Sequence, residues 1–337
     1  MAALAGLALI GPLVPMAARA ASSGPVEDAR EAARRVPFTA RVEVSWVDSA
    51  GVHTAEMGVR AVGGNIRIQA GAGSGVGSGT VGAGPATGLR SGSAMVLQAS
   101  AVTPVAGAGE LLVPALERKY DVERSPGPTV AGRDTDLFVL RAGGRDRERL
   151  AIDKATGLVL RREVLGPDGR PVRIVNVLQL DTAPVPEPAD GRPSKAAAPR
   201  TVPVAGLPAG YRGPDVLAGG YRRVAAYRHD RLVHLLYTDG LHGMSLFSQP
   251  GTLAAGSLPP GGEAVQVGAS TGIHYTWPGG DVVTWQVGQV VHTLVGDGTS
   301  GDLLAAARSM PLPASPSLLA RLRGTSRLVA ELVSGGR

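Results

Sequence analysis

The sequence predicts an α+β protein made of two antiparallel units in series. Apolar residues recur at helical spacing over residues 22–36, and strict alternation begins at residue 41, which indicates a helix followed by strands. Turn signals then divide residues 150–180 into three apolar runs of strand length. A Pro- and Ala-rich stretch over 182–205 separates these runs from a second series of strand patterns. We therefore expect a curved antiparallel sheet with a helix, followed by a smaller α/β unit that has its own antiparallel sheet.

Composition excludes several classes of function. The chain has 337 residues, which is enough for two domains, and a formal net charge of +6 that comes almost entirely from arginine. No basic run is interleaved with aromatic residues, so the sequence does not predict nucleic-acid binding. There are no cysteines, which excludes disulfides, thiol catalysis and Cys-ligated zinc.

The N-terminus has the pattern of an export signal. Residues 1–20 are an apolar run that ends in Ala18-Arg19-Ala20, a small-residue cleavage pattern, although no Lys or Arg precedes the apolar core. The alternative is an uncleaved anchor. The run is interrupted by Gly11, Pro12 and Pro15 and is shorter than the roughly 20 apolar residues that a spanning helix needs. We expect a cleaved signal peptide and an exported protein.

The first unit is expected over residues 23–181 and begins with a helix. Ser23 is a candidate N-cap, Pro25 suits the first turn, and Glu27 and Asp28 suit the positive end of the helix dipole. Alternation of Val42, Val44 and Trp46 with polar residues predicts a strand, with a turn over 48–51 and a further strand around residues 66–68. Residues 110–122 hold a short predicted helix.

Residues 71–94 are a Gly-rich segment that we expect to be a mobile loop. Gly77, Gly79 and Gly82 match G-x-G-x-x-G by spacing alone. A dinucleotide site needs a strand before this motif and an amphipathic helix after it, and the sequence has neither. We therefore predict no cofactor here.

The strand block is the most regular part of the first unit. Residues 136–142, 147–153, 158–165 and 172–180 read as strands, with tight turns over 153–157 and 166–169. In the last of these strands Ile174 and Leu178 make one face apolar, and Val175 and Val177 make the other face apolar. Such a strand needs cover on both sides, which favours a curved sheet around a hydrophobic interior or a packed helix.

The second unit is expected over residues 206–312. Strand patterns occupy 232–237, 243–249, 272–278 and 281–296, the last divided at Gly288, and a helix follows over 300–310. Residues 313–337 form a basic amphipathic pattern, which suits either packing on the domain or contact with anionic lipid.

A search for catalytic chemistry returns no site. The six histidines form no H-E-x-x-H or H-x-H motif, so a metal site is not predicted. A Ser-His-Asp triad stays open because its members need not be close in sequence. The chain reads as a non-enzymatic binding protein, with no catalytic residue and no metal ligand assigned.

Three stretches resemble the periplasmic sigma-E regulatory proteins of the RseB/MucB type. Residues 120–180 contain "VAGR", "RERLAID" and "TGLVLRREVL", which are similar to the strand block of that family. "GLPAGYR" at 206–212 is similar to the entry of its C-terminal domain. "HLLYTDGLHGMSLFSQP" at 234–250 resembles a hairpin of that domain, with Thr238 where serine is usual, and "VHTLVGD" at 291–297 is similar to its end.

The resemblance implies a fold and a function. The fold is an N-terminal curved antiparallel half-barrel covered by helices, of the lipoprotein-carrier superfamily, with the smaller C-terminal α/β domain. The implied function is binding of the extracytoplasmic part of a membrane-spanning anti-sigma factor, which is thereby shielded from a site-1 protease. In the family, lipid or misassembled envelope components relieve this protection. The expected location is the periplasm or the outer face of the cytoplasmic membrane. A homodimer is left open.

Two sets of site residues follow from the resemblance together with the strand patterns. The candidate partner-binding residues lie in the hairpin of the second unit: Tyr237, Asp239, Gly240, Leu241, Ser245 and Phe247. A structural role is the alternative, because Asp-Gly suits a tight turn and the apolar residues suit a core. The candidate residues lining a lipid cavity are Val42, Val44, Trp46, Leu158, Leu160, Ile174 and Leu178. A lipid carrier of the envelope is the second hypothesis, and an enzyme is the third.

Overall fold

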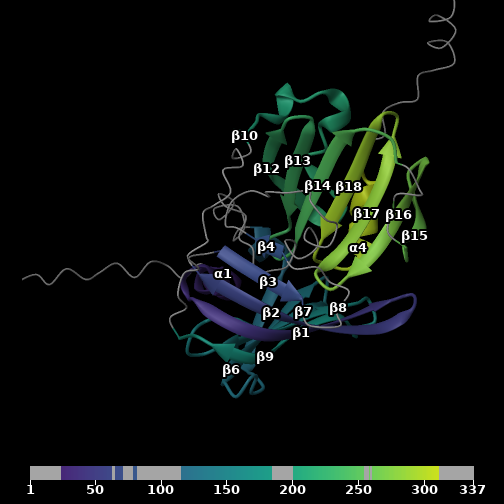
Figure 1. The fold of residues 1–337 in the computed structure, drawn as a ribbon. Helices are drawn as coiled ribbons and strands as arrows, with labels where there is room; N and C mark the ends of the chain where they lie inside the picture. Colours follow the sequence, from purple (N-terminus) through teal and green to yellow (C-terminus); the bar gives the residue numbers. More distant parts are fainter. Residues whose placement is uncertain are drawn as a thin grey trace, which may run out of the picture.

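The described residues of the computed structural model form two antiparallel sheets with few helices (Figure 1). These residues are 24–62, 65–70, 79–81, 115–183, 200–253, 258 and 260–310. The sheets follow each other in the sequence, as the patterns predicted. The predicted signal peptide, the tail over 313–337 and most of the Gly-rich segment lie outside the described residues.

The first sheet has the strand order β4-β3-β2-β1-β9-β8-β7-β6-β5, and its end strands β4 and β5 do not pair with each other. It is therefore an open sheet. Its strands are β1 (Phe38–Asp48), β2 (Gly51–Val62), β3 (Asn65–Ala70), β4 (Gly79–Val81), β5 (Asp121–Pro126), β6 (Thr135–Ala142), β7 (Arg145–Asp153), β8 (Val159–Leu165) and β9 (Pro171–Asp181).

The predicted turns of this sheet are confirmed. Asp48 closes the β1–β2 turn by accepting hydrogen bonds from the backbone N–H groups of Ala50 (2.8 Å) and Gly51 (3.2 Å). At the β7–β8 turn the backbone N–H of Gly157 donates to the carbonyl of Asp153 (2.8 Å), and Gly157 has φ +76°, a region that favours glycine. These local signals fix the register, which sets the face to which each side chain points.

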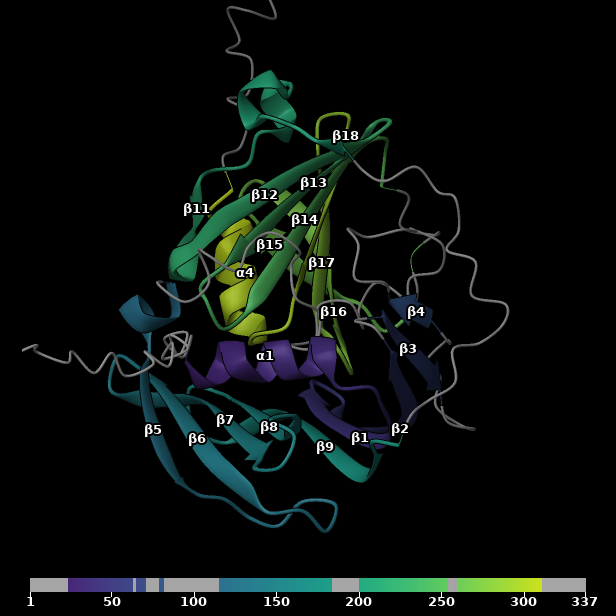
Figure 2. The ribbon, with the colours of Figure 1, turned by 90° about the vertical axis from the view of Figure 1, so that its left-hand side faces the viewer.

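Helix α1 (Pro25–Arg35) lies between the two sheets (Figure 2). Its first turn carries Pro25 and the acids Glu27 and Asp28, as predicted. The N-cap is Gly24 rather than Ser23, and no side chain caps the helix. Sequence favoured serine because its hydroxyl can accept an N–H bond, whereas the positive φ (+92°) at the cap position suits glycine.

The second sheet runs in the order β10-β12-β13-β14-β18-β17-β16-β15, and β11 pairs with β12. Helix α4 (Ser300–Arg308) begins after Thr299, whose hydroxyl accepts from the backbone N–H of Asp302 (3.2 Å). The strands are β10 (Arg200–Thr201), β11 (Val216–Leu217), β12 (Tyr221–His229), β13 (Leu232–Thr238), β14 (Gly243–Pro250), β15 (Glu263–Val267), β16 (Ser270–Trp277), β17 (Gly280–Val287) and β18 (Val290–Gly296). Three 3-10 turns occupy Val204–Gly206, Ala209–Tyr211 and Ala218–Gly220.

The structure differs from the sequence expectations at several strands. β10 lies inside the stretch expected to be a linker, and β4 lies inside the Gly-rich segment, where no strand was predicted. β12 and β15 were also not predicted. The pattern of β12, YRRVAAYRH, lacks clean alternation because arginines interrupt it. The predicted short helix is present as a helical turn over residues 115–119.

Buried apolar residues form three clusters. The largest fills the second unit, where Trp285, Leu294 and Leu246 of the sheet pack with Leu303 and Ala306 of α4. We call the second cluster, beneath the C-terminal half of α1, the sheet-face cluster: Ala32, Phe38, Val42, Val44, Met57, Ala61, Val130, Ala151, Leu158, Leu160 and Val177. We call the third the seam cluster: Val26, Ala29, Leu116, Tyr120, Phe138, Leu140, Leu150, Ile152 and Leu241.

Among the described residues no helix is long and apolar enough to cross a membrane.

Candidate functional site

The turn between β13 and β14 has a fixed local structure. The Thr238 hydroxyl donates to the carbonyl of His242 (2.8 Å) and accepts from the backbone N–H of Gly240 (3.0 Å). One Asp239 carboxylate oxygen, Oδ1, accepts from the backbone N–H groups of Leu241 (3.0 Å) and His242 (2.7 Å). This arrangement is the one in which Asp and Thr side chains replace backbone partners in tight turns.

This turn inserts into the first unit. Leu241 is the one member of the seam cluster that comes from the second unit, and it is 4% exposed. Gly240 lies so close to the helical turn 115–119 that a Cβ at this position would overlap the backbone of Leu116, and its φ is +96°. Glycine is therefore required here both by conformation and by close approach. We call residues 239–242 the docking turn.

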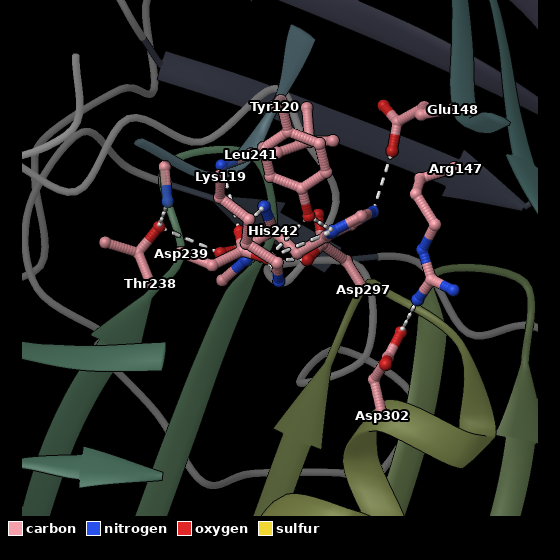
Figure 3. Close-up of polar contacts among 12 residues, drawn as sticks. Lys119, Tyr120, Arg147, Glu148, Thr238, Asp239, Leu241, His242, Asp297 and Asp302 are labelled. Atoms are coloured by element: carbon pink, nitrogen blue, oxygen red, sulfur yellow. Dashed lines mark hydrogen bonds and ion pairs between the residues drawn. The ribbon is translucent and has the colours of Figure 1, made fainter. Parts of the chain in front are cut away.

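The Asp239 carboxylate bonds to the helical turn that receives it (Figure 3). Its Oδ2 accepts from the Lys119 ammonium and from the Tyr120 hydroxyl, the latter at 2.7 Å. Burial alone would raise the pKa of Asp239, but hydrogen bonds and charges from His242 and Lys119 lower it below its ordinary value. Burial and the Asp239 charge raise the pKa of Tyr120, so its hydroxyl stays a donor. Asp239 is thus an ionised, fully paired carboxylate.

Helix α1 also contacts the docking turn. The Arg30 guanidinium donates from Nη2 to the carbonyl oxygens of Gly240 (3.0 Å) and Leu241 (3.1 Å). Its Nη1 lies 3.5 Å from Glu27 Oε2 of the same helix. A charged donor therefore satisfies two carbonyls of the buried docking turn, an interaction stronger than a neutral hydrogen bond.

A buried ion network continues from His242 into the first sheet (Figure 3). Glu148 of β7 accepts two bonds from Arg162 of β8, Nε to Oε1 at 2.7 Å and Nη2 to Oε2 at 3.1 Å. His242 Nε2 lies 2.7 Å from Glu148 Oε2, an ion pair between the two units. Arg162 Nη1 also donates to Asp297 Oδ2 (3.1 Å), which follows β18 of the second sheet.

Two further arginines cross between the units. Arg173 of β9 donates from Nη2 to Asp281 Oδ2 (2.8 Å), and its Nη1 reaches the carbonyls of Asp297 (3.3 Å) and Gly298 (3.1 Å). Arg147 of β7 donates to Asp302 Oδ2 (2.8 Å) in the first turn of α4. We call this whole set of contacts, with the docking turn, the seam.

The charges of the seam are mutually stabilised. Burial alone would raise the pKa of Glu148, but the Arg162 and His242 charges outweigh it and lower the pKa to about 2. Burial alone would lower the pKa of His242, but the Glu148 charge and the bond to Asp239 raise it to about 10. At neutral pH the histidine is therefore cationic, and the carboxylates that face it are ionised.

The ion pairs of the seam have a structural role. Each acid just described bonds to an arginine, a lysine or a histidine, and the described residues contain no group of His, Asp and Glu able to hold a metal ion. Ser248 Oγ lies 2.9 Å from His292 Nδ1, a contact of the kind that a serine nucleophile makes with its base, but Ser248 is only 1% exposed. Burial lowers the pKa of His292 to about 4.

The structure places the candidate partner-binding residues in or beside the docking turn. Asp239, Gly240 and Leu241 contact the first unit as described. Tyr237 is 1% exposed, lies in the core of the second unit and donates its hydroxyl to the carbonyl of Pro214 (3.0 Å). Phe247 is buried, and its ring stacks on His234 with centroids 4.2 Å apart. Ser245 is half-buried in β14. Their part in partner binding stays a prediction.

The candidate lipid-cavity residues do not all share one face. Val42, Val44, Leu158 and Leu160 belong to the sheet-face cluster, and Trp46 packs against it. Ile174 pairs with Ser45, so its side chain points to the opposite face, and grouping it with Val44 was wrong. The register shift between Arg41 and Val42 also separates Leu178 from this set, because Val177, not Leu178, is opposite Val42. Two-sided apolar strands leave the choice of face open to sequence analysis.

Sequence analysis missed the charged residues of the seam, although a signal existed. Glu148 lies two positions before Leu150 and therefore on the same strand face as Leu150 and Ile152. Arg173 lies on the same strand face as Val175 and Val177. A charge at a core-facing position of a strand needs a buried partner. The partners in the second unit could not be found, because Asp281 lies 108 residues from Arg173 and Asp297 lies 135 residues from Arg162.

Comparison with known families confirms the resemblance to the RseB/MucB type. A family model described as MucB/RseB N-terminal domain matches residues 90–201. No curated protein matches the chain.

The solved structures that match this chain include structures of MucB. The complex of Pseudomonas aeruginosa MucA/MucB is 19% identical, with a TM-score of 0.42, and covers 87% of this chain and 99% of that chain. A crystal structure of MucB is 19% identical, with a TM-score of 0.45, and covers 86% and 97%. A putative outer membrane lipoprotein-sorting protein domain from Vibrio parahaemolyticus is 15% identical, with a TM-score of 0.20, and covers 49% and 94%.

Proposed function

We propose that this RseB/MucB-type protein binds the extracytoplasmic part of a membrane-spanning anti-sigma factor and controls its proteolysis. The observation that carries the proposal is the MucB/RseB N-terminal domain match over residues 90–201. MucB itself has been solved in complex with MucA and with the periplasmic part of MucA. The export pattern over residues 1–20 supports a location in the periplasm or on the outer face of the cytoplasmic membrane.

The seam supports binding rather than catalysis. Its charged side chains pair with one another and hold the two sheets together. A partner therefore meets one extended surface instead of two surfaces that move separately. A preorganised surface binds with less loss of conformational entropy. The buried position of Asp239 and Leu241 makes them holders of this surface. Contact between these two side chains and a partner requires the seam to open.

Lipid is the second ligand in this proposal. The open first sheet is taken as a half-barrel covered by helices, and its apolar face consists of Val42, Val44, Leu158 and Leu160 with Trp46 at the margin. Apolar side chains on a concave face suit an acyl chain. Lipid bound on this face relieves the protection of the anti-sigma factor. A lipid carrier is the alternative function, favoured by the same face.

A pull-down tests the proposal. Residues 22–337 are immobilised, detergent-solubilised membranes of the source organism are passed over them, and retained proteins are identified. Retention of a single-span anti-sigma factor at stoichiometric amounts, lost when the second unit is deleted, is the expected result. Retention of lipid without any membrane protein would contradict it and favour the carrier.

A further inference from the structure

We propose that helix α1 couples ligand binding on the first sheet to the contact between the two units. An apolar ligand that displaces α1 from the first sheet also weakens the hold of α1 on the docking turn. One end of the helix fills the sheet-face cluster, and its other end holds the docking turn. An acyl chain on the sheet face then competes with the helix, and movement of the helix releases the seam. This inference rests on the lipid part of the proposed function.

The helix belongs to two apolar clusters at once. Ala32 is buried in the sheet-face cluster, with Ala33 and Val36 packed against it. Val26 and Ala29 are buried one turn earlier in the seam cluster, together with Leu241 of the docking turn. Both contacts are made by one rigid helix of 11 residues, so its two ends cannot shift independently.

The polar contacts of the helix are divided in the same way. The Arg30 guanidinium of α1 donates to the docking turn of the second unit, as described. Arg34, one turn later, bonds only within the helix, to Glu31 (2.9 Å) and Glu27 (3.0 Å). Arg30 therefore links α1 to the docking turn, and Arg34 is a comparison position whose side-chain bonds stay within the helix.

Competition follows from packing. Ala32 is 2% exposed, and its Cβ lies within 3.2 Å of the position that a Cβ on Gly157 would take. A close-packed interior has no spare volume for an acyl chain, so a ligand on the sheet face has to displace α1. Coupling between two sites is reciprocal: if ligand binding weakens the seam, a weakened seam strengthens ligand binding by the same factor.

The absence of cysteine makes the test direct, because two introduced cysteines can be spin-labelled without background. Val52→Cys on the first sheet and Val216→Cys on the second are exposed sites, at 75% and 43%. The distance distribution between the labels is measured with and without cis-parinaric acid, a fatty acid that fluoresces in apolar surroundings. A decrease in energy transfer from tryptophan to the probe in Trp46→Phe locates the probe near the sheet face, because Trp277 and Trp285 lie in the second unit.

The expected result is a broader or longer distance distribution when the probe is bound. Arg30→Ala is expected to broaden the distribution without the probe and to tighten probe binding about fivefold or more, whereas Arg34→Ala changes neither. Probe binding with an unchanged distribution, or equal probe affinity in the two variants, overturns the coupling. Failure of the probe to bind also overturns it, and neither outcome affects retention of the anti-sigma factor in the pull-down.

Discussion

Replacement of Arg162 by methionine tests whether the ion network holds the two units together. The Arg162 side chain is buried and makes three hydrogen bonds, two to Glu148 and one to Asp297. Methionine keeps the apolar length of the side chain and removes the charge. Glu148 then keeps only His242, and Asp297 keeps its Oδ1 contact with the backbone N–H of Gly243 (2.8 Å). Loss of one partner of a buried ion pair costs about 3–5 kcal/mol.

The assay is urea denaturation followed by tryptophan fluorescence. Arg124→Met is the control, because Arg124 makes a comparably short ion pair with Asp136 (2.6 Å) with 65% of its side chain exposed, where about 0–1 kcal/mol is expected. A double-mutant cycle with Asp297→Asn is expected to give a coupling energy of about 0.5–3 kcal/mol across the seam. A loss in Arg162→Met no larger than in Arg124→Met would refute the reasoning.

Three further predictions concern the docking turn and the core around it. The free energy of unfolding should fall as the pH drops below about 4.5 towards the pKa of Glu148 (about 2), because folding lowers that pKa. It should also fall as the pH rises from about 6.5 through the pKa of His242 (about 10), because folding raises that pKa. A free energy of unfolding that does not change with pH would contradict both statements. Gly240→Ala should lose several kcal/mol in urea denaturation, because the new Cβ overlaps backbone at a φ of +96°, whereas Gly243→Ala has open space and should cost about 1 kcal/mol or less. Tyr237→Ala should lower the free energy of unfolding by about 3–5 kcal/mol, and with it the melting temperature, because it removes a buried ring. An unchanged melting temperature with weaker partner binding would instead support a role for Tyr237 as a contact residue.

Local features of the fold could be predicted because they depend on neighbours in sequence. The helical spacing of Val26 and Ala29, the turn-closing Asp48 and the positive-φ Gly157 all act within a few residues. The division between β17 and β18 at Gly288 was predicted for the same reason, and its φ is +61°. Strand β12 was missed because its arginines serve tertiary partners: Arg223 bonds to the carbonyls of Gly213 (2.7 Å) and Pro214 (3.2 Å).

The site could be predicted only as far as the turn. Asp-Gly at 239–240 indicated a tight turn, and this is confirmed, but its insertion beside Leu116 depends on how two units fold against each other. The same holds for Arg162 and Asp297, whose contact joins residues 135 positions apart. Hydrophobic patterning shows which face of a strand is buried; it does not show what buries it.

Protection of an anti-sigma factor from proteolysis tests the central claim most directly. The extracytoplasmic segment of the anti-sigma factor retained in the pull-down is incubated with its site-1 protease, with and without this protein, and the intact segment is quantified over time. We predict slower cleavage with residues 22–337, and cleavage at the unprotected rate with the second unit deleted. Equal cleavage rates with and without the full chain, at concentrations where the two proteins bind, would contradict the regulatory role.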